Sequence, residues 1–290
     1  MKYLAALMFC FCTQALAGPK LYVFDCGLLN LESLELFGIA PDESSVRQMF
    51  VPCYLIEHEN GLLLWDGGLP RAVAEAEGPV SIDGGSMVYD HWIVDQLADM
   101  GLTPGDIDYM AFSHLHFDHA GGLLSAYEDG KAPELLFPNA KYLVSEKHWQ
   151  RAVKPHPRDR ASFIPKLNAL LEQSGRLVFV NDSSCDLLPG VTFEFTDGHT
   201  PGMMHSTIAD VVFCADLIPG KAWIHVPISM GYDRFPELLI DEKTNFLNEH
   251  SQLNHRFFFT HDPEISVAKT VLNEGRFSTT DEQKILLEER

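Results

Sequence analysis

The chain has 290 residues, of which 46% are hydrophobic and 21% are charged, and these ordinary globular proportions exclude a disordered, collagen-like or multi-span membrane protein. Its 21 basic and 41 acidic residues give a formal net charge of -20. Such a negative field repels phosphate backbones, so we expect no nucleic-acid partner.

The first predicted element is a secretory signal peptide over residues 1–17. One basic residue precedes an apolar stretch over residues 3–12, and residues 15–17, Ala-Leu-Ala, provide the small-residue pattern of a cleavage site. A buried N-terminal helix or an uncleaved anchor is the alternative. The apolar stretch is short for a bilayer span, so we expect an exported protein, periplasmic or secreted, without stable membrane insertion after signal cleavage. No linker or repeat interrupts residues 18–290, which we predict to form a single domain.

Removal of the signal leaves four cysteines, and in an oxidising compartment these permit three complete pairings. They are Cys26, Cys53, Cys185 and Cys214. Cys26 and Cys53 each lie at the edge of a predicted strand, so a bridge between them is one expectation. Separate buried thiols are the other.

The first third of the mature chain predicts strands, a loop and a helix. Strands are expected over residues 21–24, 52–57 and 62–65, the last two joined as a hairpin. From residue 66 to 88, a Gly-, Pro- and Ala-rich stretch without periodicity predicts a loop beside a site. Asp90 is the predicted cap of a helix that ends at Met100.

The remaining chain alternates predicted strands and helices, which indicates a layered α/β protein with mixed sheets. Strands are expected over residues 109–112, 141–144, 177–180, 191–195, 207–208, 211–214 and 257–260. Helices are expected over residues 146–153, 162–173, 236–250 and 265–272. The tail after Phe277 predicts a mobile end or a solvated helix.

A dense group of metal-binding residue types follows the strand at residues 109–112. His114 and His116 lie two positions apart, so in extended backbone they share a face and can hold one ion. Asp118 and His119 follow where the chain turns and can face a second position. Imidazole nitrogen and carboxylate oxygen suit zinc and related first-row divalent metals, with manganese, iron and cobalt as alternatives.

Three later residues complete a possible ligand set. His199 lies in a Gly-His-Thr-Pro-Gly motif, Asp216 follows the strand over residues 211–214, and His261 follows the strand over residues 257–260. Each lies at the carboxyl end of a strand or in the loop after it, where α/β proteins gather their sites. Structural roles for all seven residues would require seven coincidences of placement.

The motif His-x-His-x-Asp-His, the later Gly-His-Thr-Pro-Gly, the aspartate after a strand and the late histidine resemble the metallo-β-lactamase superfamily, in its order. The resemblance implies an αββα sandwich of two mixed β-sheets flanked by helices, with two divalent metal ions, zinc first among them, at one edge of the sheets. It implies that His114, His116 and His199 hold one ion, that Asp118, His119 and His261 hold the other, and that Asp216 bridges both.

Within that superfamily, residues 51–56, 65–68, 113–122 and 261–262 resemble the N-acyl-homoserine lactonase branch. This resemblance implies that the protein opens a lactone or cleaves a similar ester, using a bridging hydroxide formed when the two cations lower the pKa of a shared water. Asp118 is the expected catalytic proton donor to the leaving group.

One position departs from the lactonase pattern. The branch has a tyrosine three residues after the bridging aspartate, and this chain has Pro219 there. Trp223, His225 and Tyr232, in the loop over residues 217–236, are therefore the expected substrate contacts and alternative donors. A phosphotriesterase, a β-lactamase and a non-catalytic metal-binding protein remain alternatives, each with a small-molecule or metal partner. The sequence does not predict an oligomeric state.

Other side chains near these motifs have two possible roles each. Asp66 is expected to orient a ligand histidine or to cap its own turn. Cys214 is expected to be a buried thiol rather than a ligand. The other histidines, His148 and His205 among them, are expected on the surface or on helices. A basic run predicts a solvated face or a lid that attracts an anion; it comprises Arg151, Lys154, Arg158, Arg160 and Lys166.

Overall fold

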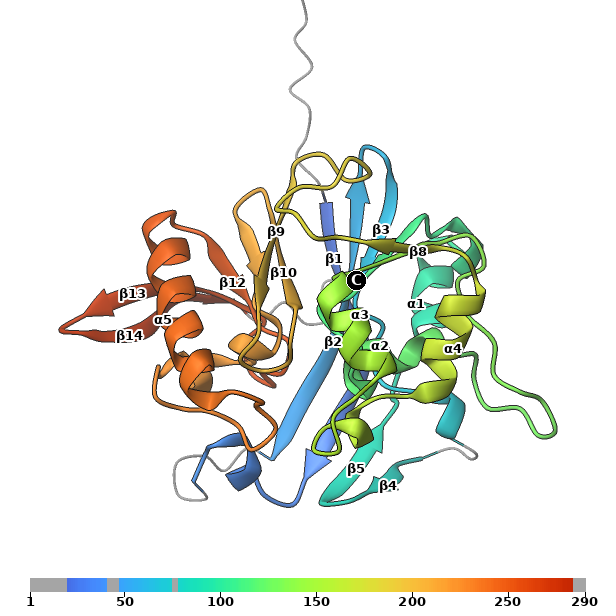
Figure 1. Ribbon diagram of the computed structural model, residues 1–290, viewed down its shortest axis with the longest axis horizontal. Coiled ribbons are helices and arrows are strands. Elements are labelled where there is room, and N and C mark those ends of the chain that lie inside the picture. Colours follow the sequence, from blue (N-terminus) through green and yellow to red (C-terminus); the bar gives the residue numbers. More distant parts are fainter. Residues whose placement is uncertain (1–19, 41–46, 75–77, 284–290) are drawn as a thin grey trace, which may run out of the picture.

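The computed structural model describes residues 20–40, 47–74 and 78–283 (Figure 1). The predicted signal peptide lies outside these residues. Among the described helices, none combines the length and the apolar character that a bilayer span requires.

An eight-stranded mixed sheet occupies the first part of the chain (Figure 1). The strands β3, β6, β7 and β8 run parallel to one another, and the other pairs of neighbouring strands are antiparallel. In spatial order the strands are β4 (Val80–Ile82), β5 (Gly85–Val88), β1 (Lys20–Leu31), β2 (Gln48–His58), β3 (Gly61–Trp65), β6 (Tyr109–Ala111), β7 (Lys141–Val144) and β8 (Leu177–Phe179).

A six-stranded mixed sheet occupies the second part of the chain. Its one parallel pair joins β11 to β12, and its other pairs are antiparallel. In spatial order the strands are β14 (Arg276–Gln283), β13 (Val267–Asn273), β12 (Arg256–Phe258), β11 (Val211–Phe213), β10 (Met203–Ile208) and β9 (Val191–Thr196).

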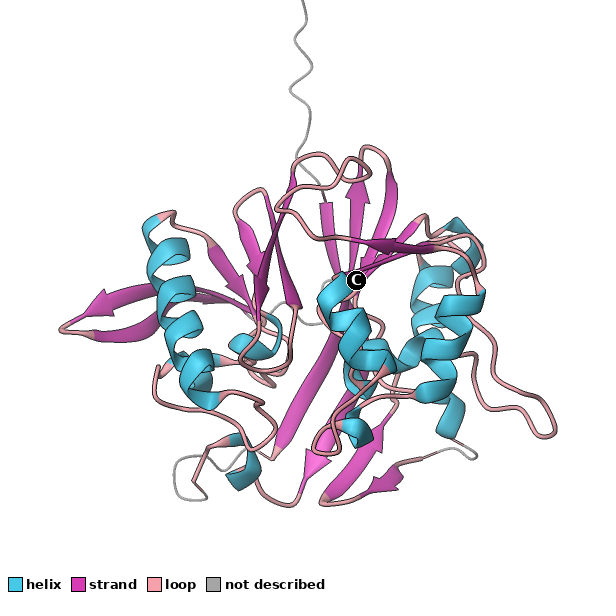
Figure 2. Cartoon of the chain, viewed as in Figure 1, coloured by secondary structure: helices cyan, strands magenta, loops and turns pink. Residues whose placement is uncertain are grey.

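Helices cover the outer face of each sheet (Figure 2). The α-helices are α1 (Ile93–Asp99), α2 (Phe117–Ala120), α3 (Glu146–Val153), α4 (Pro165–Gln173) and α5 (Pro236–Gln252). Short 3-10 helices occupy Glu35–Phe37, Arg71–Val73, Pro104–Asp106, Gly121–Leu123, Arg160–Ser162, Ala215–Leu217 and Lys221–Ile224.

Alternating side chains of the central strands build two separate cores. Tyr54 and Trp65 point toward the second sheet and pack with Phe213 and Phe258. Leu55, the next residue along β2 and the partner of Leu64, points the other way, into a core that α1, α3 and α4 cover. A third core lies between the second sheet and α5. The central strands β2, β3, β6, β7 and β11 are buried on both faces for most of their length, so they are mainly apolar. The predicted αββα sandwich is confirmed.

Two predictions for the C-terminal part of the chain are wrong. Most of residues 265–272, predicted as a helix, belong to β13, and the described part of the tail after Phe277 belongs to β14, whereas residues 284–290 lie outside the described residues. The two strands form a hairpin closed by Glu274 and Gly275, which have φ of 50° and 79°. Positive φ at both loop positions is the type I′ geometry that matches strand twist. The β-branched side chains of β13 fit this pleated, half-buried surface, and tertiary pairing overrides the helical spacing.

Two predictions nearer the start of the chain also need correction. The stretch over residues 66–88 is not wholly a loop, because it contains the β4–β5 hairpin, whose turn carries Gly84 at φ 77°. Asp90 does not cap the following helix: α1 begins at Ile93, and its N-cap residue is Trp92, without a side-chain cap.

Of the four cysteines, Cys26 and Cys53 form a disulfide with a Cα–Cα distance of 5.7 Å. The bridge joins neighbouring strands β1 and β2 beside the bulge that follows Asp25. Cys185 and Cys214 are free, and Cys214 is buried.

Candidate metal centre

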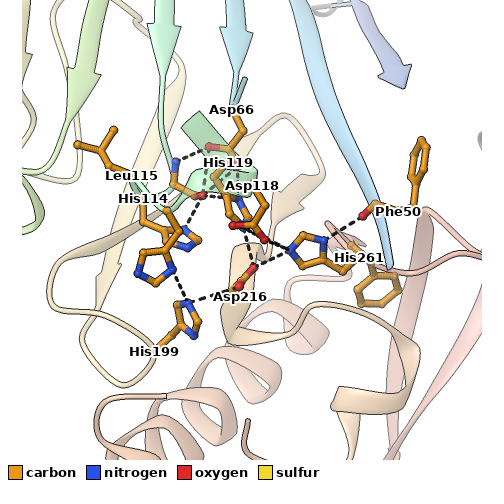
Figure 3. Close-up of polar contacts among 12 residues, drawn as sticks. Phe50, Asp66, His114, Leu115, Asp118, His119, His199, Asp216 and His261 are labelled. Atoms are coloured by element: carbon orange, nitrogen blue, oxygen red, sulfur yellow. Dashed lines mark hydrogen bonds and ion pairs between the residues drawn. The ribbon is translucent and has the colours of Figure 1, made fainter. Parts of the chain in front are cut away.

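The predicted ligands converge because their strands end at one edge of the sandwich. β9 and β11 both run antiparallel to β10, and β12 runs parallel to β11, so β9, β11 and β12 share one direction. His199, Asp216 and His261 follow the carboxyl ends of these three strands. The His114–His119 segment follows β6 in the other sheet and meets them there (Figure 3).

The first group of possible ligands comprises His114, His116 and His199. One nitrogen from each ring lies within 4.8 Å of the others, and all three side chains are buried. His116 Nδ1 and His199 Nε2 lie 3.3 Å apart. His116 still has extended backbone, and α2 begins at the next residue. This confirms that His114 and His116 point to one side while the chain turns immediately after them.

The second group comprises Asp118, His119 and His261, whose donor atoms also lie within 4.8 Å of one another. His261 Nε2 is 3.3 Å from His119 Nε2 and 3.6 Å from Asp118 Oδ2. The side chain of Asp118 is 14% exposed, whereas those of His119 and His261 are 2% and 1% exposed. Asp118 is therefore the member of this group that a bound molecule can approach.

Asp216 lies between the two groups and presents a different oxygen to each. Its Oδ1 is 3.1 Å from His119 Nε2 and 3.3 Å from His261 Nε2, and its Oδ2 is 3.4 Å from His199 Nε2. Burial alone would raise the pKa of this carboxyl, but the surrounding imidazoles hold it well below its usual range. Asp216 thus contacts both groups of possible ligands, each through a different oxygen.

The donor set fits divalent cations. His114 Nε2 is buried and lacks a hydrogen-bond partner among the described residues. Its lone pair is therefore available to coordinate a cation. Burial, followed by the neighbouring imidazoles, holds the pKa values of His114 and His116 well below their usual range. Both rings are therefore neutral at physiological pH, the form that coordinates a metal. Five imidazoles and two carboxylates are the ligand types that zinc and related metals accept.

Asp66 supports the second group, which agrees with one of its two predicted roles. Its Oδ2 lies 3.0 Å from His119 Nδ1, on the side of the ring opposite the other ligands. Its Oδ1 accepts a 2.8 Å hydrogen bond from Ser113 N, and Ser113 Oγ also contacts the carboxylate. Asp66 has φ 56°, a left-handed conformation that aspartate tolerates better than most residues. This turn aims the carboxylate at His119.

Two further groups contact the outer nitrogens of candidate ligand rings, and no sequence motif indicates either of them. Asp233 is buried, and its Oδ1 lies 2.8 Å from His199 Nδ1. The carbonyl of Phe50, in β2, lies 2.9 Å from His261 Nδ1 (Figure 3). Such contacts fix the orientation of a ligand ring and the nitrogen that it presents. Asp233 is 34 residues from His199 in sequence, and Phe50 acts through its backbone, so neither forms a local pattern.

His148 is a helix residue, which is one of the two predicted placements, but it is not on the surface. It lies on α3 and is fully buried, with its ring 5.9 Å from that of His114. Its Nε2 accepts a hydrogen bond from Leu115 N, and its Nδ1 donates to Pro201 O. Burial lowers its pKa to about 3, so the neutral ring links the His114 segment to the loop that carries His199. His205 and His250 are also buried, away from the centre.

The predicted substrate contacts occupy two different places. Trp223 and His225 line a cavity of about 440 Å³, and none of the seven candidate ligands lines it. Trp223 is buried there, and its indole donates to Phe37 O. Tyr232 is instead 44% exposed and packs on Phe37, with burial and then Asp83 and Asp118 raising its phenol pKa. Tyr232 therefore lies close enough to Asp118 for that carboxylate to influence its pKa.

Pro219 and Cys214, which the sequence analysis singled out, have the following contacts. Pro219 has no side-chain donor, and its carbonyl accepts a hydrogen bond from His261 N. Cys214 belongs to none of the possible ligand groups in the described chain, and burial raises the pKa of its thiol well above the usual range. It is a buried apolar thiol, as expected.

Comparisons of the sequence agree with this geometry. The profile of the metallo-beta-lactamase superfamily matches residues 46–261. An N-acyl homoserine lactonase of Bacillus thuringiensis is 30% identical over 176 residues, which are 56% of this chain and 62% of that protein. The N-acyl homoserine lactonase AttM of Agrobacterium fabrum is 32% identical over 165 residues, 52% of this chain and 57% of that protein. The chain thus spans about three-fifths of the length of these curated relatives.

Comparisons of the structure cover more of the chain. A probable metal-dependent hydrolase from Staphylococcus aureus has a TM-score of 0.77 at 23% identity, over 93% of this chain and 99% of that one. AidC, a dizinc quorum-quenching lactonase in complex with a product, has a TM-score of 0.72 at 23% identity, over 92% of this chain and 96% of that one. These structures share the fold, and together with the sequence matches they confirm the predicted resemblance.

Proposed function

The chain belongs to the metallo-beta-lactamase superfamily, and from that premise we propose that it is a dinuclear metal-dependent hydrolase that opens a lactone of the N-acyl-homoserine type or cleaves a similar ester. The observation that carries the proposal is the convergence of five imidazoles and two carboxylates, in which Asp216 contacts His119 and His261 of one group and His199 of the other.

We propose zinc as the metal, with His114, His116 and His199 holding one ion and Asp118, His119 and His261 holding the other. Two such cations, when bound, supply the Lewis acidity that activates water at neutral pH and polarises a substrate carbonyl. The protein supplies fixed positions, because Asp66, Asp233 and the carbonyl of Phe50 each hold the outer nitrogen of a ligand ring.

Asp118 is the proposed proton carrier of the reaction. Its side chain is the most exposed of the seven candidate ligands. Like Asp216, it contacts both His119 and His261. A carboxyl in that position can take a proton from water and deliver it to the leaving oxygen. The buried histidines around it exclude bulk water from the opposite side.

Tyr232 is the proposed donor in place of the tyrosine that the lactonase pattern has at the position of Pro219. Its hydroxyl-bearing ring is partly exposed and within electrostatic reach of Asp118, whereas Trp223 is buried with its donor engaged. We propose that His225 and Trp223 contact the substrate only where part of it enters the cavity that they line.

A substrate panel tests the function. Purified protein loaded with zinc is assayed with N-hexanoyl-homoserine lactone, a chromogenic cephalosporin, an aryl ester and an aryl phosphotriester. We expect the lactone to give the highest kcat/KM and Tyr232→Phe to lower its kcat. Preference for the phosphotriester or the cephalosporin would replace the lactone assignment, and absence of turnover with two ions bound would favour a metal-binding role.

We also propose that the protein is exported and acts outside the cytoplasm. The signal-like residues 1–17 support this, and the Cys26–Cys53 disulfide agrees with an oxidising compartment. Fractionation of cells that express the full chain, with N-terminal sequencing of the product, tests both export and cleavage.

A further inference from the structure

The basic run of residues 151–166 lies against the candidate centre. In α3, Arg151 follows His148 by three residues, so the two share a helix face. Further along, Phe163 pairs with His116 in an isolated β-bridge, and the two rings are 5.0 Å apart. The segment between these two contacts, which contains Arg158, therefore passes beside the His116 half of the centre.

A second segment approaches the same half of the centre from the other side. The backbone N–H of Arg234 donates to the carbonyls of Gly198 and His199, and the adjacent Asp233 holds the His199 ring. This segment and the basic run touch directly, because Arg158 Nη2 donates to Gly231 O.

Arg158 and Arg234 hold consecutive carbonyl groups. Arg158 binds the carbonyl of Gly231 at 3.4 Å, and Arg234 binds that of Tyr232 through Nε and Nη2 at 2.9 and 2.5 Å. Two guanidinium groups are thereby fixed next to each other in a protein whose net charge is -20. Burial, and then Arg158, lowers the pKa of Arg234, which indicates that the two cations repel each other.

The acids nearby are already engaged. Asp159 Oδ2 accepts two hydrogen bonds from Arg151, and Asp233 binds the His199 ring and Met230 N. Neither forms an ion pair with Arg158 or Arg234 within the part of the chain that the structure describes. Arg234 Nη1 is buried and has no hydrogen-bond partner there, although Asp159 Oδ1 is also unpartnered. A buried guanidinium nitrogen without an acceptor is costly, and an anion would satisfy it.

We propose that Arg158 and Arg234 form a subsite for a carboxylate carried by the substrate, beside the His116 and His199 half of the centre. The inference rests on the proposed hydrolase function and names its substrate class: lactones or esters whose acyl arm ends in a negative charge. A carboxylate suits this pair, because Arg234 Nη1 lacks an acceptor within the described chain and Arg158 uses only its Nη2 on the Gly231 carbonyl there. The two arginines also attract an anion locally, against the repulsion from the negative net charge of the whole molecule.

The test compares two lactones that differ only at the end of the acyl arm. N-glutaryl-homoserine lactone carries a carboxylate, and N-pentanoyl-homoserine lactone has a methyl group in its place. We expect the zinc-loaded protein to favour the glutaryl compound at least tenfold in kcat/KM. In R158Q and R234Q the preference falls toward one, chiefly through a higher KM for the glutaryl compound, and in R158K and R234K part of it remains.

Lys166→Gln is the matched control, because Lys166 is an exposed cation of the same run. K166Q keeps the wild-type preference if the two arginines form a defined subsite. Equal kcat/KM values for the two lactones in the wild-type protein would overturn the proposal. A loss of preference in K166Q as large as that in R158Q would also overturn it, because the effect would then arise from bulk charge.

A binding measurement separates failure of the subsite from failure of the hydrolase. Glutarate is titrated calorimetrically into the zinc-loaded protein and into R158Q, R234Q and K166Q. A tenfold or larger loss of affinity confined to the two arginine variants supports the subsite even if no lactone is cleaved. Equal glutarate affinity in all four proteins refutes the subsite even if lactones are cleaved.

Discussion

Two aspartates of the centre have different surroundings, and these separate their functions. Asp216 is surrounded by three imidazoles, which keep it ionised, and its two oxygens face different ligand groups. Asp118 contacts the second group only and is the more exposed carboxylate. The first is suited to hold charge in place, and the second is suited to move a proton.

Asp118→Asn tests the proton-carrying role. The amide retains a ligand oxygen but cannot accept and deliver a proton, so kcat should fall by about 100-fold or more. Steady-state kinetics with N-hexanoyl-homoserine lactone measures the loss. Retention of more than a few per cent of the wild-type kcat would contradict the assignment.

Asp66→Asn tests whether a contact behind a ligand ring controls metal affinity. In the wild-type protein one carboxylate oxygen accepts a hydrogen bond from Ser113 N and the other contacts His119 Nδ1. The amide has only one oxygen for these two donors, so the His119 ring is held less firmly in its orientation. We expect zinc affinity to drop about 10- to 100-fold. Competition with a chromophoric chelator measures it, and the exposed Asp90→Asn is the control. Unchanged affinity in D66N would show that Asp66 serves only its turn.

Most strands and helices could be predicted from apolar periodicity, whereas the C-terminal hairpin could not. β2 and β3 have continuous apolar runs, and α3 begins at Glu146, directly after the N-cap Ser145, whose side chain accepts a hydrogen bond from His148 N. Val267–Asn273 also has helix-compatible spacing, and only pairing with β12 and β14 makes it a strand. Local pattern cannot report such a partner.

The centre shows the same division between local and long-range information. The convergence of the candidate ligands could be predicted because metal coordination demands particular residue types at strand ends, as at His114, His116 and Asp118. Asp233 and Phe50 were not, because their contacts join segments 34 and 211 residues apart. The buried position of His148 also depends on packing between α3 and the centre rather than on its neighbours in sequence.

The β13–β14 turn offers a prediction about stability. Glu274 has φ 50°, a left-handed conformation that Asn adopts at lower cost. Glu274→Asn should raise the free energy of unfolding by about 0.5 kcal/mol. Urea denaturation measures the change. Glu274→Ala removes the same charge without that tolerance, and an equal gain in both variants would show that the turn geometry is not the cause.

His205, in β10, offers a prediction about pH. It is fully buried against Phe246, and burial lowers its pKa to about 4 from the usual 6.5. Below pH 6.5 the unfolded chain takes up a proton that the folded chain refuses, so stability is complete above pH 6.5 and is lost as pH falls toward 4. The loss from this one group is about 3 kcal/mol.

The measurement is the free energy of unfolding from pH 7 to 4.5 in the wild-type protein and in His205→Gln, which cannot take up that proton. The difference between them should shrink as pH falls, because only the wild-type protein carries the penalty. The exposed His91→Gln serves as the control. A constant difference across this range would contradict the burial argument.

Across the whole molecule, the sandwich brings distant segments to one edge and holds them there. The eight-stranded sheet contributes the His114–His119 segment, and the six-stranded sheet contributes His199, Asp216 and His261. Aromatic packing of Tyr54 and Trp65 against Phe213 joins the two sheets directly behind that edge. The position of the centre at the junction of both sheets explains why neither half alone contains a complete ligand set.

Metal content per chain tests this account most directly. Purified wild-type protein and Asp216→Ala are dialysed against buffer with limiting zinc and analysed by mass spectrometry of the elements. We expect two ions per wild-type chain and one or fewer in D216A, because the bridging carboxylate serves both positions. Less than one ion in the wild-type protein, or two retained in D216A, would contradict the shared centre.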